Sequence, residues 1–225
     1  MKDLTPPWHL PGDVAYRWFE DDPTLAGVRL AALSDEERLR LESFKAARRR
    51  HEFMLGRAAA RTLLADRLEI DPPDVPLRVA ADGGLDVDGT DLHVSISHAS
   101  RQAVAAVGVR RVGIDLESTI RRSADLHRFV FHPEEIAEFD RLPLDGQSSQ
   151  ILCWALKEAA LKARRSGLRY SPRRLRIHLA FDRGEAVLHE EDGSQQWQAR
   201  FMHRNGLFMA IAYEQRTDGS PPGAP

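Results

Sequence analysis

The stretch Val112-Gly113-Ile114-Asp115-Leu116-Glu117 decides how the rest of this chain is interpreted. It is apolar or small apart from two carboxylates, Asp115 and Glu117, that stand two residues apart. Side chains two apart on a β-strand point to the same face of the sheet. If the stretch is a strand, the two carboxylates lie side by side and offer oxygen ligands to a hard cation.

A second stretch, Trp154-Ala155-Leu156-Lys157-Glu158-Ala159, lies in a pattern that predicts a helix over residues 151–163. Trp154, Glu158 and Lys162 follow each other at four-residue spacing and so share one face of that helix. A third carboxylate and a lysine from this helix could complete a site for a metal-bound phosphate ester. The alternative is an ordinary Glu158–Lys162 pair on a helix surface.

Composition limits the classes of function. The 225 residues include 32 basic and 34 acidic residues, so nothing in the overall charge favours binding to nucleic acid or to a membrane. No apolar run approaches the roughly 18 residues of a spanning helix, and residues 1–7 lack the apolar core of a signal peptide. We expect a cytoplasmic protein whose single cysteine, Cys153, is a buried structural thiol.

The alternation in residues 92–98 predicts a strand that carries Ser97 and His98 to its carboxyl end. Residues 103–109 and 112–116 predict two further strands, and we expect the three to be neighbours in one sheet. An adjacent Ser-His pair is weak evidence for a catalytic dyad, because such partners normally come from distant segments. A phosphate-binding pair is the better interpretation.

Ser34 and Glu37 form the pattern of a capping box, which predicts the start of a long helix that reaches about Arg67, with a break near Ala46. Arg48-Arg49-Arg50-His51 in that segment is the densest basic run of the chain. It is either a solvated helix face or a phosphate contact, because arginine forks match phosphate oxygens.

The second part of the chain predicts short helices near residues 124–130 and 133–139, the latter with Glu135 in its first turn, where acids are favoured. Four strands over residues 175–181, 185–189, 197–202 and 207–213 predict a second sheet. By composition we expect a disordered tail over residues 216–225.

Gly113-Ile114-Asp115-Leu116-Glu117, followed by Trp154-x-x-Lys157-Glu158-Ala159-x-x-Lys162, strongly resembles the 4'-phosphopantetheinyl transferases. The resemblance is to the longer, monomeric type that serves peptide and polyketide synthetases, and it extends in order over most of the chain. It implies an α/β (α+β) fold of two similar halves related by a pseudo-twofold axis, with the site in the cleft between them. We expect the N-terminal α/β half over residues 1–111 and the C-terminal α/β half over residues 112–215. It also implies a Mg²⁺-dependent enzyme that moves the phosphopantetheine arm of coenzyme A onto a serine of an apo carrier protein and releases adenosine 3',5'-bisphosphate.

The resemblance also implies roles for individual residues. Asp115, Glu117 and Glu158 would be the Mg²⁺ ligands. Lys157 and Lys162 would hold phosphate and the departing group. Residues implied to bind coenzyme A, besides these lysines, are Ser97 and His98, and Arg40 near its 3'-phosphate. Glu158, Glu135 or a metal-bound water could accept the proton of the carrier serine, and the sequence does not choose among them.

The chain departs from the family pattern at three places. It has Gly84-Leu85-Asp86 where many relatives have Gly-Lys-Pro, Glu52 where an arginine is common, and Arg165 where a glycine often stands. We hypothesise that Arg48, Arg49 or Arg50 replaces the missing cation. The carrier would bind over residues 123–144, between the two main motifs.

Two other functions compete with the transferase. Metal-dependent nucleases also combine Asp, Glu and Lys around Mg²⁺, but this chain lacks the basic surface that duplex DNA favours. A non-catalytic module that binds coenzyme A or a carrier is the other alternative, and it would not require all three carboxylates and Lys157.

Overall fold

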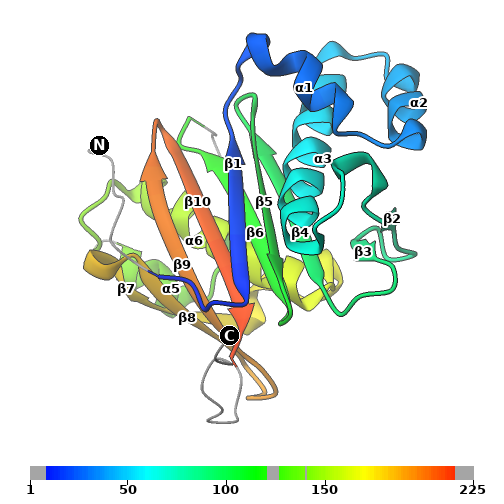
Figure 1. Cartoon of the computed structure of the whole chain (residues 1–225). Helices are drawn as coiled ribbons and strands as arrows, with labels where there is room; N and C mark the ends of the chain where they lie inside the picture. Colours follow the sequence, from blue (N-terminus) through cyan, green and yellow to red (C-terminus); the bar gives the residue numbers. More distant parts are fainter. Residues whose placement is uncertain (1–8, 121–126, 140, 216–225) are drawn as a thin grey trace.

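The computed structural model describes residues 9–120, 127–139 and 141–215 (Figure 1). Its first sheet is antiparallel and has five strands in the order β1-β5-β4-β3-β2. The strands are β1 (Val14–Phe19), β2 (Leu77–Val79), β3 (Leu85–Val87), β4 (His93–Ala99) and β5 (Gln102–Gly108).

The second sheet is also antiparallel, with five strands in the order β6-β10-β9-β8-β7. Its strands are β6 (Val112–Ser118), β7 (Leu175–Ala180), β8 (Glu185–Glu190), β9 (Gln196–Arg204) and β10 (Leu207–Glu214). Both sheets thus place their first and last strands together at one edge and run back through the others in turn. This shared topology confirms the expected α/β fold of two similar halves.

The helices come between the first and second strands of each sheet in the sequence. They are α1 (Ala26–Ala31), α2 (Asp35–Ser43) and α3 (Ala47–Leu68) in the first half, and α4 (His127–Val130), α5 (Pro133–Phe139) and α6 (Gly146–Arg164) in the second. Short 3₁₀ turns cover Pro23–Leu25, Pro72–Asp74, Gly167–Arg169, Pro172–Arg174 and Phe181–Arg183. Among the described residues, none of the helices combines the length and apolar character needed to cross a bilayer.

Local sequence signals explain several helix ends. The hydroxyl of Ser34 accepts a hydrogen bond from the amide of Glu37, whose side chain accepts from the Ser34 amide, so the predicted capping box is confirmed. Phe44 and Ala46 are extended, which confirms the break near Ala46 and separates α2 from α3. The predicted helix over 151–163 starts earlier, because Asp145 caps α6 through the amide of Ser148.

One long helix packs on each sheet. α3 lays an alanine-rich face, which includes Ala59 and Ala60, against Ala105 of β5. α6 packs in the same way on the second sheet, and Gly113 of β6 allows it to approach closely. A third apolar cluster joins the halves, with Val14, Val104 and Ala106 from the first sheet and Ile114, Leu116, Met209 and Ile211 among those from the second.

The expectation that residues 92–98, 103–109 and 112–116 share one sheet is wrong. β6 pairs with β10 and begins the second sheet. It lies beside β4 without pairing with it as a strand. The contact is made by the backbone amide of Ile114, which donates to the side-chain hydroxyl of Ser95 at 3.1 Å. Alternation indicates that a segment is a strand, but does not specify which strand it pairs with.

Candidate active site between the two halves

The two stretches that dominate the sequence meet where α6 crosses β6. The indole nitrogen of Trp154 donates to Oε1 of Glu117 at 2.9 Å. Two turns further along α6, the ammonium of Lys162 donates to Oδ1 of Asp115 at 2.7 Å. Glu158 lies midway between these helix residues, at four-residue spacing from each, and so on the face of α6 that meets the carboxylates of β6.

Asp115 is held by contacts from both halves of the chain. It is 4% exposed, and its Oδ1 also accepts a hydrogen bond from the hydroxyl of Ser97 at 2.8 Å. Its other oxygen, Oδ2, is buried and has no hydrogen-bond partner among the residues that the structure describes. A buried carboxylate oxygen in that state is costly, and a bound cation would remove the cost.

Asp115, Glu117 and Glu158 are the three predicted metal ligands. Within the part of the chain that the structure describes, no three His, Cys, Asp or Glu side chains are gathered as a metal site. One oxygen of Asp115 is bound to Lys162, and one of Glu117 to Trp154. The metal role of the three therefore stays a prediction. The unpartnered Oδ2 of Asp115 and the all-oxygen donor set fit a hard cation such as Mg²⁺.

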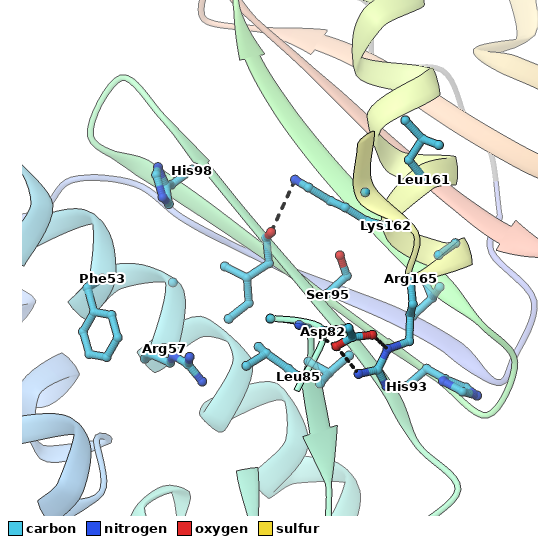
Figure 2. Close-up of a pocket in the computed structure, with 18 of the residues that line it drawn as sticks. Phe53, Arg57, Asp82, Leu85, His93, Ser95, His98, Leu161, Lys162 and Arg165 are labelled. Atoms are coloured by element: carbon cyan, nitrogen blue, oxygen red, sulfur yellow. Dashed lines mark hydrogen bonds and ion pairs between the residues drawn. The ribbon is translucent and has the colours of Figure 1, made fainter. Parts of the chain in front are cut away.

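A cavity of about 440 Å³ lies between α3 and the end of α6 (Figure 2). Its walls come from both halves of the chain: from α3, the turn between β2 and β3, β4, the start of β6 and the C-terminal end of α6. The basic side chains that line it are Arg57, His93, His98, Lys162 and Arg165. Two acidic side chains, Glu52 and Asp82, also line the cavity, so its lining is basic on balance and suits an anionic ligand.

His98 and Lys162 are the two predicted coenzyme A residues that line this cavity. Ser97 is not among the residues that line the cavity. Its hydroxyl donates to Asp115 instead. Arg40 is exposed on α2, with its guanidinium 5.8 Å from the ring centre of Phe53, which does line the cavity.

The run Arg48-Arg49-Arg50 does not reach the cavity. Nε of Arg48 donates to Glu52 at 2.7 Å, while the guanidinium of Arg49 lies 5.4 Å from the ring centre of Phe44 and that of Arg50 donates to the Phe44 carbonyl. All three arginines are exposed, so the run lies on a solvated face of α3, and its contact to phosphate stays a prediction.

Lys157 and Glu135, both predicted to act in catalysis, form a buried pair and do not line the cavity. The ammonium of Lys157 is fully buried and donates to Glu135 at 2.7 Å and to the carbonyls of Val130 and Pro172 at 3.0 Å each. Burial lowers the pKa of Lys157, and Glu135 opposes that effect. Neighbouring helix positions are about 100° apart, so Lys157 points into the core of the second half while Glu158 points towards β6.

Cys153 lies one turn before Lys157. It is buried as expected, and burial raises the pKa of its thiol.

Sequence reasoning missed a contact that crosses the two halves. The guanidinium of Arg165 binds both oxygens of Asp82, at 2.9 and 3.0 Å, and also binds Asp86. These hydrogen bonds lower the pKa of Asp82 to about 2. Arg165 and Asp86 both stand at places where the chain departs from the family pattern. That two departures of opposite charge occur together was the sequence signal that could have indicated this contact.

The predicted carrier region, residues 123–144, lies partly outside the described residues.

Sequence reasoning also missed that Arg57 lines the cavity. Arg57 stands one turn after Phe53 and next to Gly56, which both line the cavity as well. A β-carbon on Gly56 would come within 2.8 Å of Ile96, so this face of α3 lies directly against β4.

Comparison with known proteins matches two family models to consecutive parts of the chain. The model of the 4'-phosphopantetheinyl transferase N-terminal domain matches residues 36–108, and that of the 4'-phosphopantetheinyl transferase superfamily matches residues 111–212. The boundary between the two models falls between β5 and β6.

Individual relatives agree with these matches. A 4'-phosphopantetheinyl transferase of Bacillus subtilis is 28% identical over 68% of this chain and 70% of its own length. The transferase HetI of a Nostoc species is 32% identical over 61% and 62%, and Sfp of Bacillus subtilis strain 168 is 25% identical over 62% and 63%. Among solved structures, the holo-[acyl-carrier-protein] synthase of Thermotoga maritima matches with a TM-score of 0.39 at 23% identity, over 47% of this chain and 63% of its own. The two consecutive family models and these relatives show that the chain belongs to the 4'-phosphopantetheinyl transferase superfamily of enzymes, in its longer, Sfp-like type.

Proposed function

We propose that this enzyme transfers the 4'-phosphopantetheine arm of coenzyme A to a serine of an apo acyl or peptidyl carrier protein and releases adenosine 3',5'-bisphosphate. The observation that carries the proposal is the cavity between the halves, whose basic lining includes Lys162, itself bound to the buried Asp115. A ligand with several phosphate groups fits such a lining. The names of the relatives support the same reaction class.

Lys162 is the proposed contact to the leaving phosphate. Its ammonium lines the cavity and is oriented by Asp115 and by the carbonyl of Ile114, at 2.7 and 3.1 Å. A positive charge held in place beforehand stabilises the negative charge that develops on the leaving group. Ser97 supports this arrangement because its hydroxyl holds the carboxylate of Asp115.

Asp115, Glu117 and Glu158 are the proposed ligands of Mg²⁺. When bound, this ion would neutralise the pyrophosphate and act as a Lewis acid. The buried Oδ2 of Asp115 supports this assignment, because it accepts no hydrogen bond within the described part of the chain.

The carrier serine must lose its proton as it attacks. Of the two carboxylates considered as acceptors, the position of Glu158 supports the role, because it lies on the α6 face between Trp154 and Lys162. Glu135 binds the amides of His132 and Ile177 besides Lys157, so both its oxygens are in use. That the protein is monomeric and cytoplasmic stays a prediction from the sequence.

The test mixes the protein with coenzyme A, Mg²⁺ and several apo carrier proteins and follows the carriers by intact mass spectrometry. We expect one added phosphopantetheine arm per carrier and one equivalent of adenosine 3',5'-bisphosphate. Glu158→Gln should abolish the gain, while Glu69→Gln, at the exposed end of α3, should not. No gain on any carrier would contradict the proposal, and binding of coenzyme A without a gain would favour the non-catalytic module.

A further inference from the structure

A pair of histidines that the proposed reaction does not use lies on the second sheet. His178 of β7 is opposite Val187 of β8, and His189 is two residues further along β8. Alternate residues of a strand share a face, so both histidines lie on one face of the sheet. Their neighbours Ile177 and Leu188 point to the other face, where they pack in the cluster that contains α6. The histidine pair therefore lies on the side of the β7–β8 hairpin away from α6.

The two imidazole rings contact each other across the strands. Their centres are 5.3 Å apart and their planes are inclined by 74°. His178 is exposed and His189 is half-buried. Within the described part of the chain, neither ring makes a hydrogen bond or an ion pair. Because a neutral imidazole carries one nitrogen with a lone pair, each ring keeps one ligand atom for a partner outside the chain.

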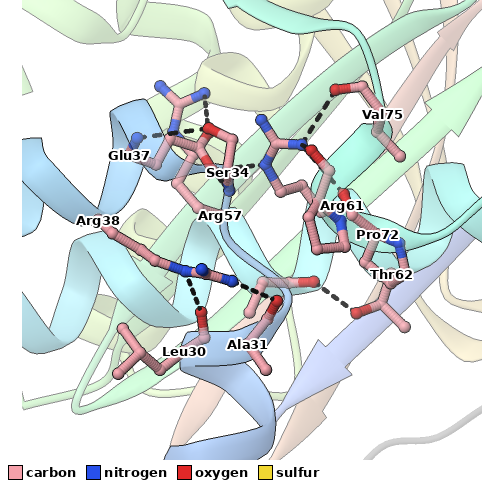
Figure 3. A network of polar contacts seen from close by, with 12 residues as sticks. Leu30, Ala31, Ser34, Glu37, Arg38, Arg57, Arg61, Thr62, Pro72 and Val75 are labelled. Atoms are coloured by element: carbon pink, nitrogen blue, oxygen red, sulfur yellow. Dashed lines mark hydrogen bonds and ion pairs between the residues drawn. The ribbon is translucent and has the colours of Figure 1, made fainter.

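A buried cation elsewhere in the protein shows the contrast. Arg61 donates to Glu37 and to the carbonyls of Pro72, Pro73 and Val75, so its donors are used inside the fold (Figure 3). The two imidazoles of the hairpin, by comparison, keep two adjacent nitrogen ligands for a group from solution.

The separation of the rings suits two ligands of one metal ion. Zn–N bonds are about 2.0–2.1 Å long, so two imidazoles on one tetrahedral ion have their ring centres about 5 Å apart. The observed separation of 5.3 Å is close to that value. The terminal torsion of a histidine side chain is broad, so each ring can turn a nitrogen towards a point between them without a movement of the backbone.

The charge directly across from the pair is neutralised. Arg176, which is opposite His189, donates to Glu134 at 3.1 Å. Burial and the neighbouring His178 lower the pKa of His189, which keeps its ring uncharged at neutral pH. Further along this face, charges again pair with each other: Glu185 with Arg183 and Arg200, at 3.3 and 3.4 Å.

We propose that His178 and His189 bind a divalent transition-metal ion such as Zn²⁺. Imidazole nitrogen suits Zn²⁺, Ni²⁺ and Cu²⁺, whereas Mg²⁺ prefers oxygen ligands and so does not compete for this pair. Water completes the coordination of the ion. The ion joins β7, the edge strand of the second sheet, to β8 through side chains as well as through the backbone ladder. An edge strand is paired on one side, so such a cross-strand clip should reduce its local opening.

The first experiment titrates the full chain with Zn²⁺ in an excess of Mg²⁺ and follows the histidine rings by ¹⁵N NMR. The resonances of His178 and His189 should shift together as one site fills. Isothermal titration calorimetry then compares wild type with His178→Gln, His189→Gln and the control His9→Gln, which changes an exposed histidine outside the pair. Each hairpin variant should weaken this site by about 10- to 100-fold or more, since loss of a ligand costs at least as much as loss of a supporting group. The control should bind Zn²⁺ as wild type does.

The outcomes decide both the site and the clip. A shift of one ring without the other, or equal Zn²⁺ affinity in wild type and both hairpin variants, would overturn the site. Zn²⁺ should also slow hydrogen exchange of the β7 amides in wild type and leave it unchanged in His189→Gln; equal exchange with and without Zn²⁺ in wild type would overturn the clip. Thermal melting checks that the variants fold, and none of these measurements depends on the proposed transfer reaction.

Discussion

Lys162 of α6 and Asp115 of β6 form an ion pair, 2.7 Å between Nζ and Oδ1, in which the carboxylate is buried and the ammonium still reaches the cavity. The lysine thus has two effects, since it neutralises a buried charge and offers positive charge to a ligand. Each can be tested, because they respond differently to a second substitution at Asp115.

Lys162→Met should destabilise the protein by about 1–3 kcal/mol, because it leaves the Asp115 carboxylate buried without its cation. It should also lower kcat/KM for transfer by about 100-fold or more, the typical cost of losing one group that stabilises developing charge. Adding Asp115→Asn should restore stability in urea unfolding but not transfer, because it also removes a proposed Mg²⁺ ligand. Recovery of transfer as well would contradict both the charge role of Lys162 and the ligand role of Asp115.

The Lys157–Glu135 pair should behave as structure rather than as part of the catalytic site. Lys157→Met or Glu135→Leu alone should cost about 3–5 kcal/mol, because each leaves one buried charge without its partner. The double variant should recover part of this loss in chemical denaturation, because no buried charge remains although the amides of His132 and Ile177 lose their acceptor, and it should retain transfer activity. A folded double variant that binds coenzyme A but transfers nothing would instead return Lys157 to the catalytic role that its motif implies.

Gly113→Ala should separate α6 from β6. A β-carbon there would overlap the carbonyl oxygen of Ala159 and the backbone nitrogen of Ala163, which cannot move independently of the helix. We expect a loss of about 3 kcal/mol, at the upper end for overpacking, together with reduced transfer because Lys162 moves with the helix. The matched control is Gly27→Ala in α1, where the added carbon meets no atom within 4 Å and should be neutral or slightly stabilising. Equal melting temperatures for the two variants would contradict this account.

The Arg165–Asp82 contact should give stability a dependence on acidic pH. The pKa of Asp82 falls from 3.8 to about 2 in the folded protein, so the folded state favours the charged carboxylate. The contribution of the contact is therefore fully present above about pH 4 and is lost as the pH falls towards 2. The stability difference between wild type and Arg165→Gln should shrink over that range, and NMR titration of the Asp82 carboxyl should show its pKa rise in the variant. A difference that stays constant from pH 4 to pH 2 would rule out Asp82 as the titrating partner.

Local patterns predicted the elements well, because they depend on neighbouring residues. The capping box at Ser34, the break near Ala46 and the four strands predicted between residues 175 and 213 are all confirmed. The spacing of Trp154, Glu158 and Lys162 also predicted a shared helix face, two of whose members contact β6.

The sequence by itself determined the strand with Asp115 and Glu117 and the helix with Lys162, because strand alternation and helical spacing depend on local geometry. The two-half α/β fold was expected from the resemblance to the transferase family. Only the tertiary structure decided that β6 starts the second sheet, that Lys157 is buried on Glu135, and that Arg57 rather than Arg48, Arg49 or Arg50 lines the cavity. The physical reason is that burial and charge pairing depend on which distant segment packs against a side chain. The spacing of residues along one helix does not contain that information.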